Sequence, residues 1–215
     1  MILEAINEIA RQQSKPREHT KKLTNQLLDY LNTYPDAYLR YHASDMILHV
    51  HSDAAYLVEP GAKSRIAGYY FLSDHPQRKA HPTIAKAILV ECKTLRHVVS
   101  SAAEAEMAGV HHNAQTAILI WLFLEVLQYL QPPTPIKTDN STTNGFIDNN
   151  IHQRRSKSWD MRYHWLRDRE SQKQFDLTWD RGINNEGDYF TKRHPSRHHL
   201  NMRPRYVCDK KTLYQ

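Results

Sequence analysis

The 215-residue sequence contains little cysteine and no long uninterrupted apolar segment. With Cys92 and Cys208 as its two cysteines, a disulfide framework is not expected, and a reducing compartment is the default. The longest apolar run, Ala117 to Leu127, is broken by Glu125 and is too short to span a bilayer. The amphipathic start MILEAINEIARQQ carries acids and does not fit a secretory signal. We therefore expect an intracellular globular protein without a membrane partner, placed either in a cytoplasmic particle or in the nucleus.

Several common catalytic signatures are also missing. The sequence has no Gly-rich phosphate-binding loop and no G-x-S-x-G nucleophile elbow. His49 and His51 share one face of a predicted strand, as two zinc ligands would, but no nearby cysteine pair completes a tetrahedral set. The favoured interpretation of these histidines is therefore two polar residues on a partly exposed strand face.

Positive charge is concentrated in the C-terminal third of the chain. The formal net charge is +6, yet residues 1–151 hold 14 basic and 15 acidic residues, whereas residues 152–215 hold 15 basic and 8 acidic residues. A near-neutral body with a basic C-terminal third suits a polyanionic partner such as nucleic acid. A basic surface retained for solubility explains the same charge equally well, so charge alone does not identify a partner.

Hydrophobic periodicity predicts an α/β fold with a helical N-terminal extension. Residues 1 to about 41 have helical spacing and are closed by Pro35. Beyond them, the pattern predicts strands at 46–53, 65–73 and 87–92, a helix from Ser101 to about Leu130, a strand ending at Asp139, a helix at 156–171, a strand at 174–179 and a short helix from Asp188. Strands joined by short turns pair antiparallel, and strands separated by helices add in parallel. We therefore expect a mixed five-stranded sheet with flanking helices.

Four acidic residues fall where expected elements end or begin. Two end predicted strands and two lie at predicted helix starts: Asp53, Asp139, Glu106 and Asp188. Such carboxylates can converge at one edge of a sheet, where their mutual repulsion calls for a cation. Oxygen ligands suit Mg²⁺ or Mn²⁺, and two such ions can support phosphodiester cleavage. Taken singly, each acid is better explained as a turn residue or a helix-terminal residue, so the hypothesis depends on all four together.

Two neighbouring acids in the stretch SSAAEAEMAG differ in their expected roles. Ser101 and Glu104 fit the capping box S-x-x-E, which marks a helix start. In a helix, residues two positions apart are separated by about 200° around the axis. Glu104 and Glu106 therefore cannot both bind one pair of metal ions, and the capping box assigns Glu104 to the helix end.

Five segments follow one another in a specific order: LHVHSDAAYL, VVSSAAEAEMAG, TDNSTTNG, RSKSWDMRYHWLRDR and GDYFTKRHP. They resemble the RNase H domain of copia-type LTR retrotransposon polyproteins, whose pattern is S-D-A, S-S-x-E-A-E, x-D-N, R-x-K-x-x-D-x-R-Y-H and A-D-x-F-T-K. Each motif is weak alone, but five in order at compatible spacing are specific. The resemblance implies an RNase H-like domain at residues 42–195. The preceding LTNQLLDYLNTYPDAYLRYH resembles the end of a reverse transcriptase's connection region, which implies that assignment for residues 1–41, and residues 196–215 are expected to form a basic, poorly ordered tail.

The resemblance implies a metal-dependent endonuclease that cleaves the RNA strand of RNA–DNA hybrids and leaves 5′-phosphate and 3′-hydroxyl ends. It implies two Mg²⁺ or Mn²⁺ ions, with Asp53 bridging both and Asp188 completing the site that activates water. Glu106, which matches the family's acid, and Asp139 would hold the ion at the leaving 3′ oxygen. RNA would be recognised through its 2′-hydroxyl groups. Candidate substrate contacts are Asn140, Ser141, Thr142, Arg154, Arg155, Lys157 and Lys192.

The sequence departs from the family pattern at three points. Gly187 replaces the usual alanine before the last acid, and glycine starts a helix less firmly. The loop DRGINNEG lacks the histidine that many relatives use as a proton shuttle, which leaves another group or water for product release. No Tyr-x-Asp-Asp polymerase signature occurs, so we interpret the chain as a piece of a reverse transcriptase, partnered by the polymerase part of its own polyprotein, or as a remnant gene. Two alternatives stay open: a non-catalytic nucleic-acid-binding remnant, and another RNase H-superfamily nuclease.

Overall fold

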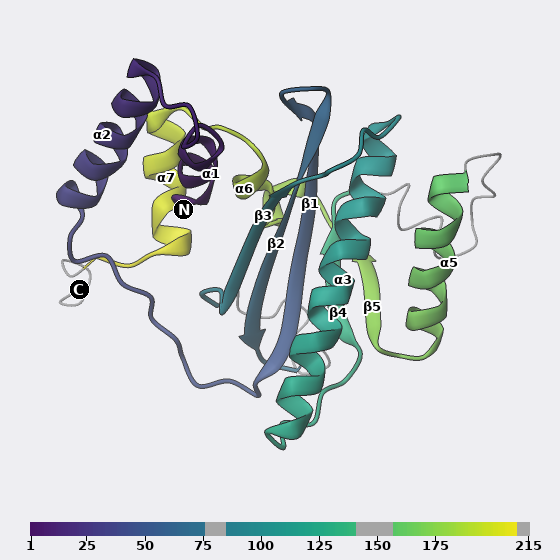
Figure 1. Cartoon of the computed structure of the whole chain (residues 1–215). Helices are drawn as coiled ribbons and strands as arrows, with labels where there is room; N and C mark the ends of the chain where they lie inside the picture. Colours follow the sequence, from purple (N-terminus) through teal and green to yellow (C-terminus); the bar gives the residue numbers. More distant parts are fainter. Residues whose placement is uncertain (76–84, 141–156, 210–215) are drawn as a thin grey trace. The chain divides into compact units, whose positions relative to one another are not determined.

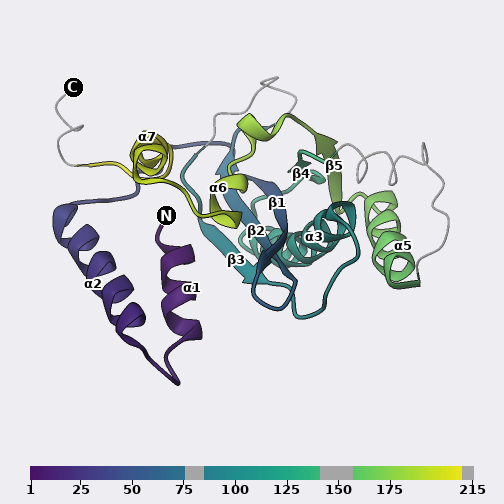
Figure 2. The same cartoon turned by 90° about the horizontal axis from the view of Figure 1, so that it is seen from above.

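The computed structural model describes residues 1–75, 85–140 and 157–209, and for residues 157–160 it describes the backbone. The chain divides into two compact units, Met1–Tyr41 with Arg193–Gln215, and His42–Lys192. Figure 1 labels the elements of both units, and Figure 2 gives the same elements from above. Within the described ranges, none of the helices combines the length and the apolar character that a membrane crossing requires.

The smaller unit contains the helices α1 (Leu3–Arg11), α2 (Glu18–Thr33) and α7 (Ser196–Tyr206). The helical character predicted for the N-terminal segment is therefore confirmed, in the form of two helices. Arg193 joins this unit through its guanidinium, which lies 2.9 Å from Glu4 Oε1 and 2.8 Å from Glu8 Oε2. The assignment of residues 1–41 to a reverse transcriptase's connection region stays a prediction.

The expectation of a poorly ordered C-terminal tail is wrong for residues 196–206, which form α7. Arg203 is buried there, with its guanidinium carbon 3.9 Å from the centroid of the Tyr34 ring and its Nη2 donating to Asp209 Oδ1 at 2.7 Å. An isolated antiparallel β-bridge between Tyr38 and Cys208 also joins the segment after α2 to the segment after α7. The basic composition misled the prediction, because arginine can be buried when its charge is paired and its plane stacks on an aromatic ring.

The larger unit is built on one mixed sheet. Its strands are β1 (Ile47–Glu59), β2 (Lys63–Ser73), β3 (Leu89–Thr94), β4 (Thr134–Thr138) and β5 (Phe175–Trp179), in the spatial order β3-β2-β1-β4-β5. The first three strands pair antiparallel, whereas β4 and β5 add in parallel. This confirms the predicted mixed five-stranded sheet, although β1 continues well past its predicted end at Asp53.

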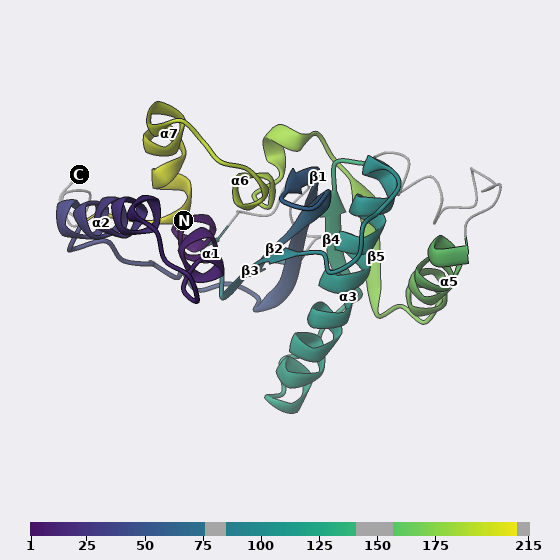
Figure 3. The same cartoon turned by 45° about the horizontal axis from the view of Figure 1, so that its top comes forward.

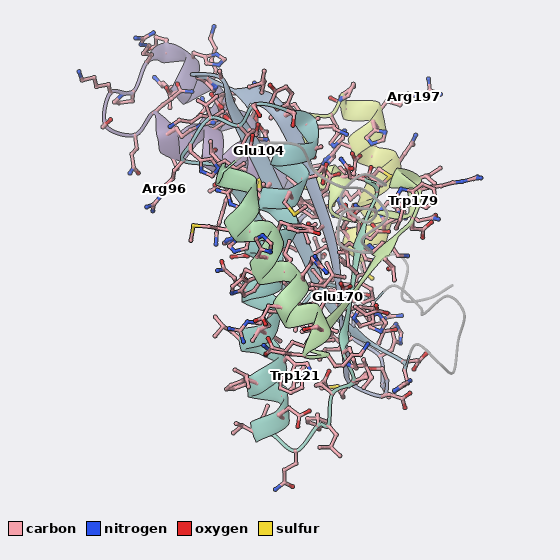
Figure 4. The ribbon with its side chains drawn as sticks, turned by 90° about the vertical axis from the view of Figure 1, so that its right-hand side faces the viewer. Arg96, Glu104, Trp121, Glu170, Trp179 and Arg197 are labelled. Carbon is pink, nitrogen blue, oxygen red and sulfur yellow. The ribbon has the colours of Figure 1, made fainter. Side chains whose placement is uncertain are left out.

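Helices flank the sheet as predicted. The long helix α3 (Ala102–Val126) runs uninterrupted and extends past the strands, and α5 (Lys157–Ser171) lies beside it (Figures 3 and 4). After β5, a 3₁₀ turn (Gly182–Asn184) leads into the short helix α6 (Asp188–Thr191), which packs on β1 and β2. The main core lies between the sheet and α3 with α5.

Alternating side chains of the central strands divide the core between the two sheet faces. Leu48, Val50 and Tyr70 are fully buried in the core cluster with α3. On the opposite face, the ring of Tyr69 stacks on Phe190 of α6 with centroids 6.2 Å apart. The acidic residue that ends the predicted first strand is on this second face, beside α6.

Substituting Gly68 by alanine is expected to lower the free energy of unfolding by roughly 1–3 kcal/mol, because the added Cβ overpacks the core. That Cβ would lie 2.6 Å from Asn113 Oδ1 and 2.7 Å from the Tyr70 ring, inside a buried hydrogen-bonded group. Chemical denaturation measures the effect, with Gly109→Ala as the control. A Cβ on Gly109 meets atoms no closer than 3.4 Å, and alanine favours a helix by about 1 kcal/mol. Equal destabilisation by both substitutions would contradict this packing.

Candidate metal centre

The parallel pairing of β1 and β4 ends just before the acidic residues. The last registered pair is His51 with Lys137. Asp53 follows on β1, and Asp139 follows the end of β4. Because β1 and β4 run parallel, residues two positions beyond their last registered pair lie close together, so the two carboxylates reach the same place at the carboxyl end of β4 although β1 itself continues.

Side chains satisfy the backbone of β1 beyond this last pair. The Ala54 N–H donates to Glu106 Oε1 at 3.1 Å, and the Asn185 side chain donates through Nδ2 to the Ser52 carbonyl at 2.7 Å. Beyond its last pair with β4, the β1 backbone is therefore contacted by a carboxylate from α3 and by an amide from the loop before α6. Glu106 is fixed next to Asp53 by the backbone of the strand that carries Asp53.

Glu104 points elsewhere, as the sequence predicted. Its N–H donates to Ser101 Oγ at 3.1 Å, which is the expected N-cap. Its carboxylate accepts from the Ser100 N–H at 2.8 Å and from Ser100 Oγ at 2.7 Å, one residue before the partner that a capping box would use. Glu104 therefore stabilises the start of α3, where Figure 4 labels it.

Three of the four predicted acids form a close group. Asp53, Glu106 and Asp139 each place one carboxylate oxygen within 4.8 Å of the others. Asp53 is 2% exposed and Glu106 is 7% exposed, whereas Asp139 is half-buried. Asp188 is not part of this group, and its carboxylate pairs with the ammonium of Lys192. Its charge still acts on Asp53 and Asp139, so the fourth acid stands beside the group.

Burial and mutual repulsion make these carboxylates reluctant to ionise. Burial, with the charges of Asp188 and Asp139, raises the pKa of Asp53 to about 7, although a hydrogen bond from Thr191 opposes the rise. Burial and the charges of Asp53 and Asp139 raise the pKa of Glu106 well above its ordinary value. The pKa of Asp139 is also raised, by burial and by Asp188. A bound cation would reverse all of these shifts.

The donor set fits a divalent cation. The group offers carboxylate oxygens alone, which Mg²⁺ and Mn²⁺ prefer. Glu106 Oε2 is buried and has no hydrogen-bond partner, while Oε1 is held by Ala54. A buried carboxylate oxygen without a donor costs free energy unless a positive charge lies next to it. The buried oxygen and the two acids facing it therefore point to a hard cation among Asp53, Glu106 and Asp139.

Thr191 is a functional residue that the sequence prediction did not single out. Its hydroxyl lies 2.6 Å from Asp53 Oδ2 and 3.0 Å from the Asp188 carbonyl, and the side chain is completely buried. The hydroxyl fixes one oxygen of Asp53 and leaves the other for a ligand. The sequence did offer a clue to this residue, because Thr191 is the threonine of the motif segment GDYFTKRHP.

The loop before α6 is anchored on β1. The Glu186 N–H donates to His51 Nδ1 at 3.1 Å, and Asn185 Oδ1 accepts from the Gly187 N–H at 2.9 Å. A Cβ on Gly187 would lie 3.2 Å from the His51 carbonyl and 3.3 Å from Asp53 Cβ, which is close for either contact. Glycine at position 187 therefore lets this loop approach the strand that carries Asp53.

The histidines considered as zinc ligands have other partners. His49 Nε2 lies 3.1 Å from the Asp74 carbonyl, and the ring stacks on Phe71 with centroids 5.3 Å apart. Burial lowers the pKa of His49. His51 accepts the Glu186 N–H, as described above. Within the described part of the chain, Asp53, Glu106 and Asp139 form the one group of three or more His, Cys, Asp or Glu side chains whose ligand atoms lie within 4.8 Å of one another.

The predicted substrate contacts are placed only in part. Asn140 directly follows Asp139, with its N–H donating to Thr138 Oγ1 at 3.3 Å, and Lys192 pairs with Asp188. Ser141, Thr142, Arg154 and Arg155 lie outside the described residues, and Lys157 begins α5. Trp179, which Figure 4 labels, lies at the end of β5 and is 49% exposed, and its Nε1 donates to the Asp139 carbonyl at 2.8 Å, a contact that the sequence did not predict.

No family model matches the sequence, and no curated protein matches it. Among solved structures, an N-terminal RNase H domain from Mycobacterium tuberculosis, fused to maltose-binding protein, is 9% identical with a TM-score of 0.46, over 68% of this chain and 91% of the other. LC11-RNase H1 in complex with an RNA/DNA hybrid is 7% identical with a TM-score of 0.47, over 66% and 92%. The RNase H domain of PFV (prototype foamy virus) is 13% identical with a TM-score of 0.44, over 70% and 91%. Similarities this distant do not transfer an activity or a substrate to this chain.

Proposed function

We propose that this chain is a metal-dependent nuclease of the RNase H type, which cleaves the RNA strand of RNA–DNA hybrids. The observation that carries the proposal is the group formed by Asp53, Glu106 and Asp139, with its buried Glu106 oxygen left for a cation. The order of the five motif segments, each acid falling in a different one, supports the choice of this nuclease class. The proposed cofactor is Mg²⁺ or Mn²⁺, and two ions are proposed because Asp188 stands beside the group.

Some residues of the site would bind the cation, and others keep the cation-binding carboxylates in position. Asp53, Glu106 and Asp139 would hold the cation, which would supply Lewis-acid stabilisation of the charge that develops at the phosphate. Thr191 orients Asp53, and the Ala54 N–H orients Glu106. Because these supporting groups are buried, the carboxylates are held in place before any ligand arrives, which lowers the cost of organising the site.

The biological setting is proposed from the sequence resemblance. The chain would act in the reverse transcription of a copia-type LTR retrotransposon, next to the polymerase part of its own polyprotein. Its location would then be a cytoplasmic particle or the nucleus. The basic residues 152–215 suit a nucleic-acid partner, whose phosphates they would contact.

Substituting Asp139 by asparagine is expected to reduce hybrid cleavage by about a thousandfold, because a ligand of the cation is lost and several kcal/mol of charge stabilisation disappear with it. The assay follows a labelled RNA strand in an RNA–DNA hybrid, with Mg²⁺ or Mn²⁺ and with EDTA. Asp168→Asn is the matched control. Asp168 lies on α5 with 58% of its side chain exposed, and its substitution should leave the rate within about twofold.

The same assay separates the alternatives. Salt-sensitive binding without any cleavage by the wild-type chain would favour a non-catalytic nucleic-acid-binding remnant. Cleavage of duplex DNA at the same rate as the hybrid would favour another RNase H-superfamily nuclease. Cleavage that is confined to the hybrid, requires the divalent ion and is lost in Asp139→Asn is the result that the proposal expects.

A further inference from the structure

One basic side chain faces the acidic group. Lys192 directly follows α6, and its ammonium forms an ion pair with Asp188 Oδ1. Its positive charge also opposes the rise in the pKa of Asp53, of Glu106 and of Asp139 that burial and the neighbouring acids cause. The same ammonium therefore interacts with all four acids that the sequence singled out.

The position of Lys192 is that of a mobile counterion. Its side chain is 51% exposed, so the ammonium reaches the acids from the solvent side on a flexible stem. Asp188 is 34% exposed, whereas Asp53 and Glu106 are buried. The buried acids are fixed by hydrogen bonds from Thr191 and Ala54, whereas the pair at the rim can open without disturbing the core.

We propose that Lys192 is a built-in counterion of the metal-free site, and that the second divalent ion, which Asp188 would help to hold, must displace the Lys192 ammonium from Asp188 in order to bind. This inference rests on the proposed metal site and adds a regulatory step to it. One oxygen of Asp188 cannot contact an ammonium and a divalent cation together without strong repulsion between the two positive charges. In the metal-free protein, the lysine thereby neutralises part of the negative charge of the acids. It also raises the concentration of divalent ion that is needed for binding.

Two measurable consequences follow for the Lys192→Gln variant. Its affinity for Mn²⁺ should rise by about three- to tenfold, because the competing charge is gone. Its melting temperature in EDTA should fall below that of the wild type, because the four acids lose their counterion, and saturating Mn²⁺ should abolish this difference. Lys192→Arg keeps the positive charge and should resemble the wild type in both measurements.

The experiment titrates the full-length chain with Mn²⁺ by calorimetry or electron paramagnetic resonance and records thermal unfolding with EDTA or with Mn²⁺. Lys93→Gln is the matched control. Lys93 is also 51% exposed and also pairs with an acid of the same unit, Glu91, which is outside the carboxylate group. The control removes one positive charge as well, yet its affinity for Mn²⁺ should change by less than about twofold.

The outcomes distinguish this inference from the proposed function. Tighter Mn²⁺ binding by Lys192→Gln than by Lys93→Gln supports the counterion, even if the wild-type chain fails to cleave a hybrid. Equal or weaker binding by Lys192→Gln overturns the counterion, even if the wild-type chain cleaves. A wild-type chain that binds no Mn²⁺ overturns both the metal site and the inference.

Discussion

Replacing Glu106 by glutamine is expected to lower the rate of hybrid cleavage by about a thousandfold while raising the melting temperature of the metal-free protein. Glutamine can still accept the Ala54 N–H, and it has nearly the same volume. It places an uncharged amide where the cation needs an anionic oxygen. At a pH high enough to ionise Glu106, the substitution also removes the repulsion between this carboxylate and Asp53 and Asp139, and each kcal/mol so gained raises the melting temperature by roughly 2–4 °C.

The matched control makes the same chemical change two residues earlier. Glu104→Gln weakens the charged hydrogen bonds to Ser100, at a cost of about 1 kcal/mol, and should lower the melting temperature. Its cleavage rate at a temperature well below melting should stay within about twofold of the wild type. Initial rates at saturating Mg²⁺ and calorimetric scans in EDTA measure both effects. Loss of activity in Glu104→Gln with retained activity in Glu106→Gln would overturn the division between the two glutamates.

The metal-free protein is expected to lose stability as the pH rises from about 4 to about 7. Asp53 has a pKa of about 7 in the folded chain and ionises near its ordinary value of 3.8 when unfolded. Between these values the unfolded chain releases a proton that the folded chain keeps, so rising pH favours unfolding. The raised pKa of Glu106 acts in the same direction. We expect the melting temperature in EDTA to fall by roughly 5–10 °C from pH 5 to pH 8.

Two comparisons test the origin of this pH dependence. Divalent ions bind the ionised carboxylates, so Mg²⁺ or Mn²⁺ should restore the melting temperature at pH 8 and have little effect at pH 5. Asp53→Asn removes one of the groups whose pKa is raised and should make the profile in EDTA less steep. A profile that keeps its slope in Asp53→Asn would assign the effect to other residues.

Much of the larger unit could be predicted because its sequence pattern and its structure obey the same periodicities. The alternation in β1 and the turns after it predicted the meander, and Ser101 predicted the start of α3 correctly. The docking of α7 could not be predicted, because it depends on Arg203 meeting Tyr34, a residue far away in the sequence. Local composition records charge but not the distant partner that allows a charge to be buried.

The acidic residues of the candidate site could be predicted from the sequence. The hydrogen bonds and ion pairs that hold these acids in place could not. Asp53 and Asp139 follow from the rule that parallel strands end at one edge. The bond from Ala54 to Glu106 depends on where the β1–β4 pairing stops, which no local pattern specifies. The pairing of Asp188 with Lys192 likewise depends on side-chain positions, so the sequence placed four acids together where the structure forms a close group of three.

The early end of the β1–β4 pairing bears on the size of ion that the site would accept. Beyond His51 and Lys137, no backbone ladder fixes the separation of the two strands. The β1 backbone beyond His51 is held instead by the Glu106 carboxylate and the Asn185 amide. Selectivity by ionic radius would then be a property of how α3 and the loop before α6 pack, and core substitutions far from the carboxylates could retune it without altering a single ligand.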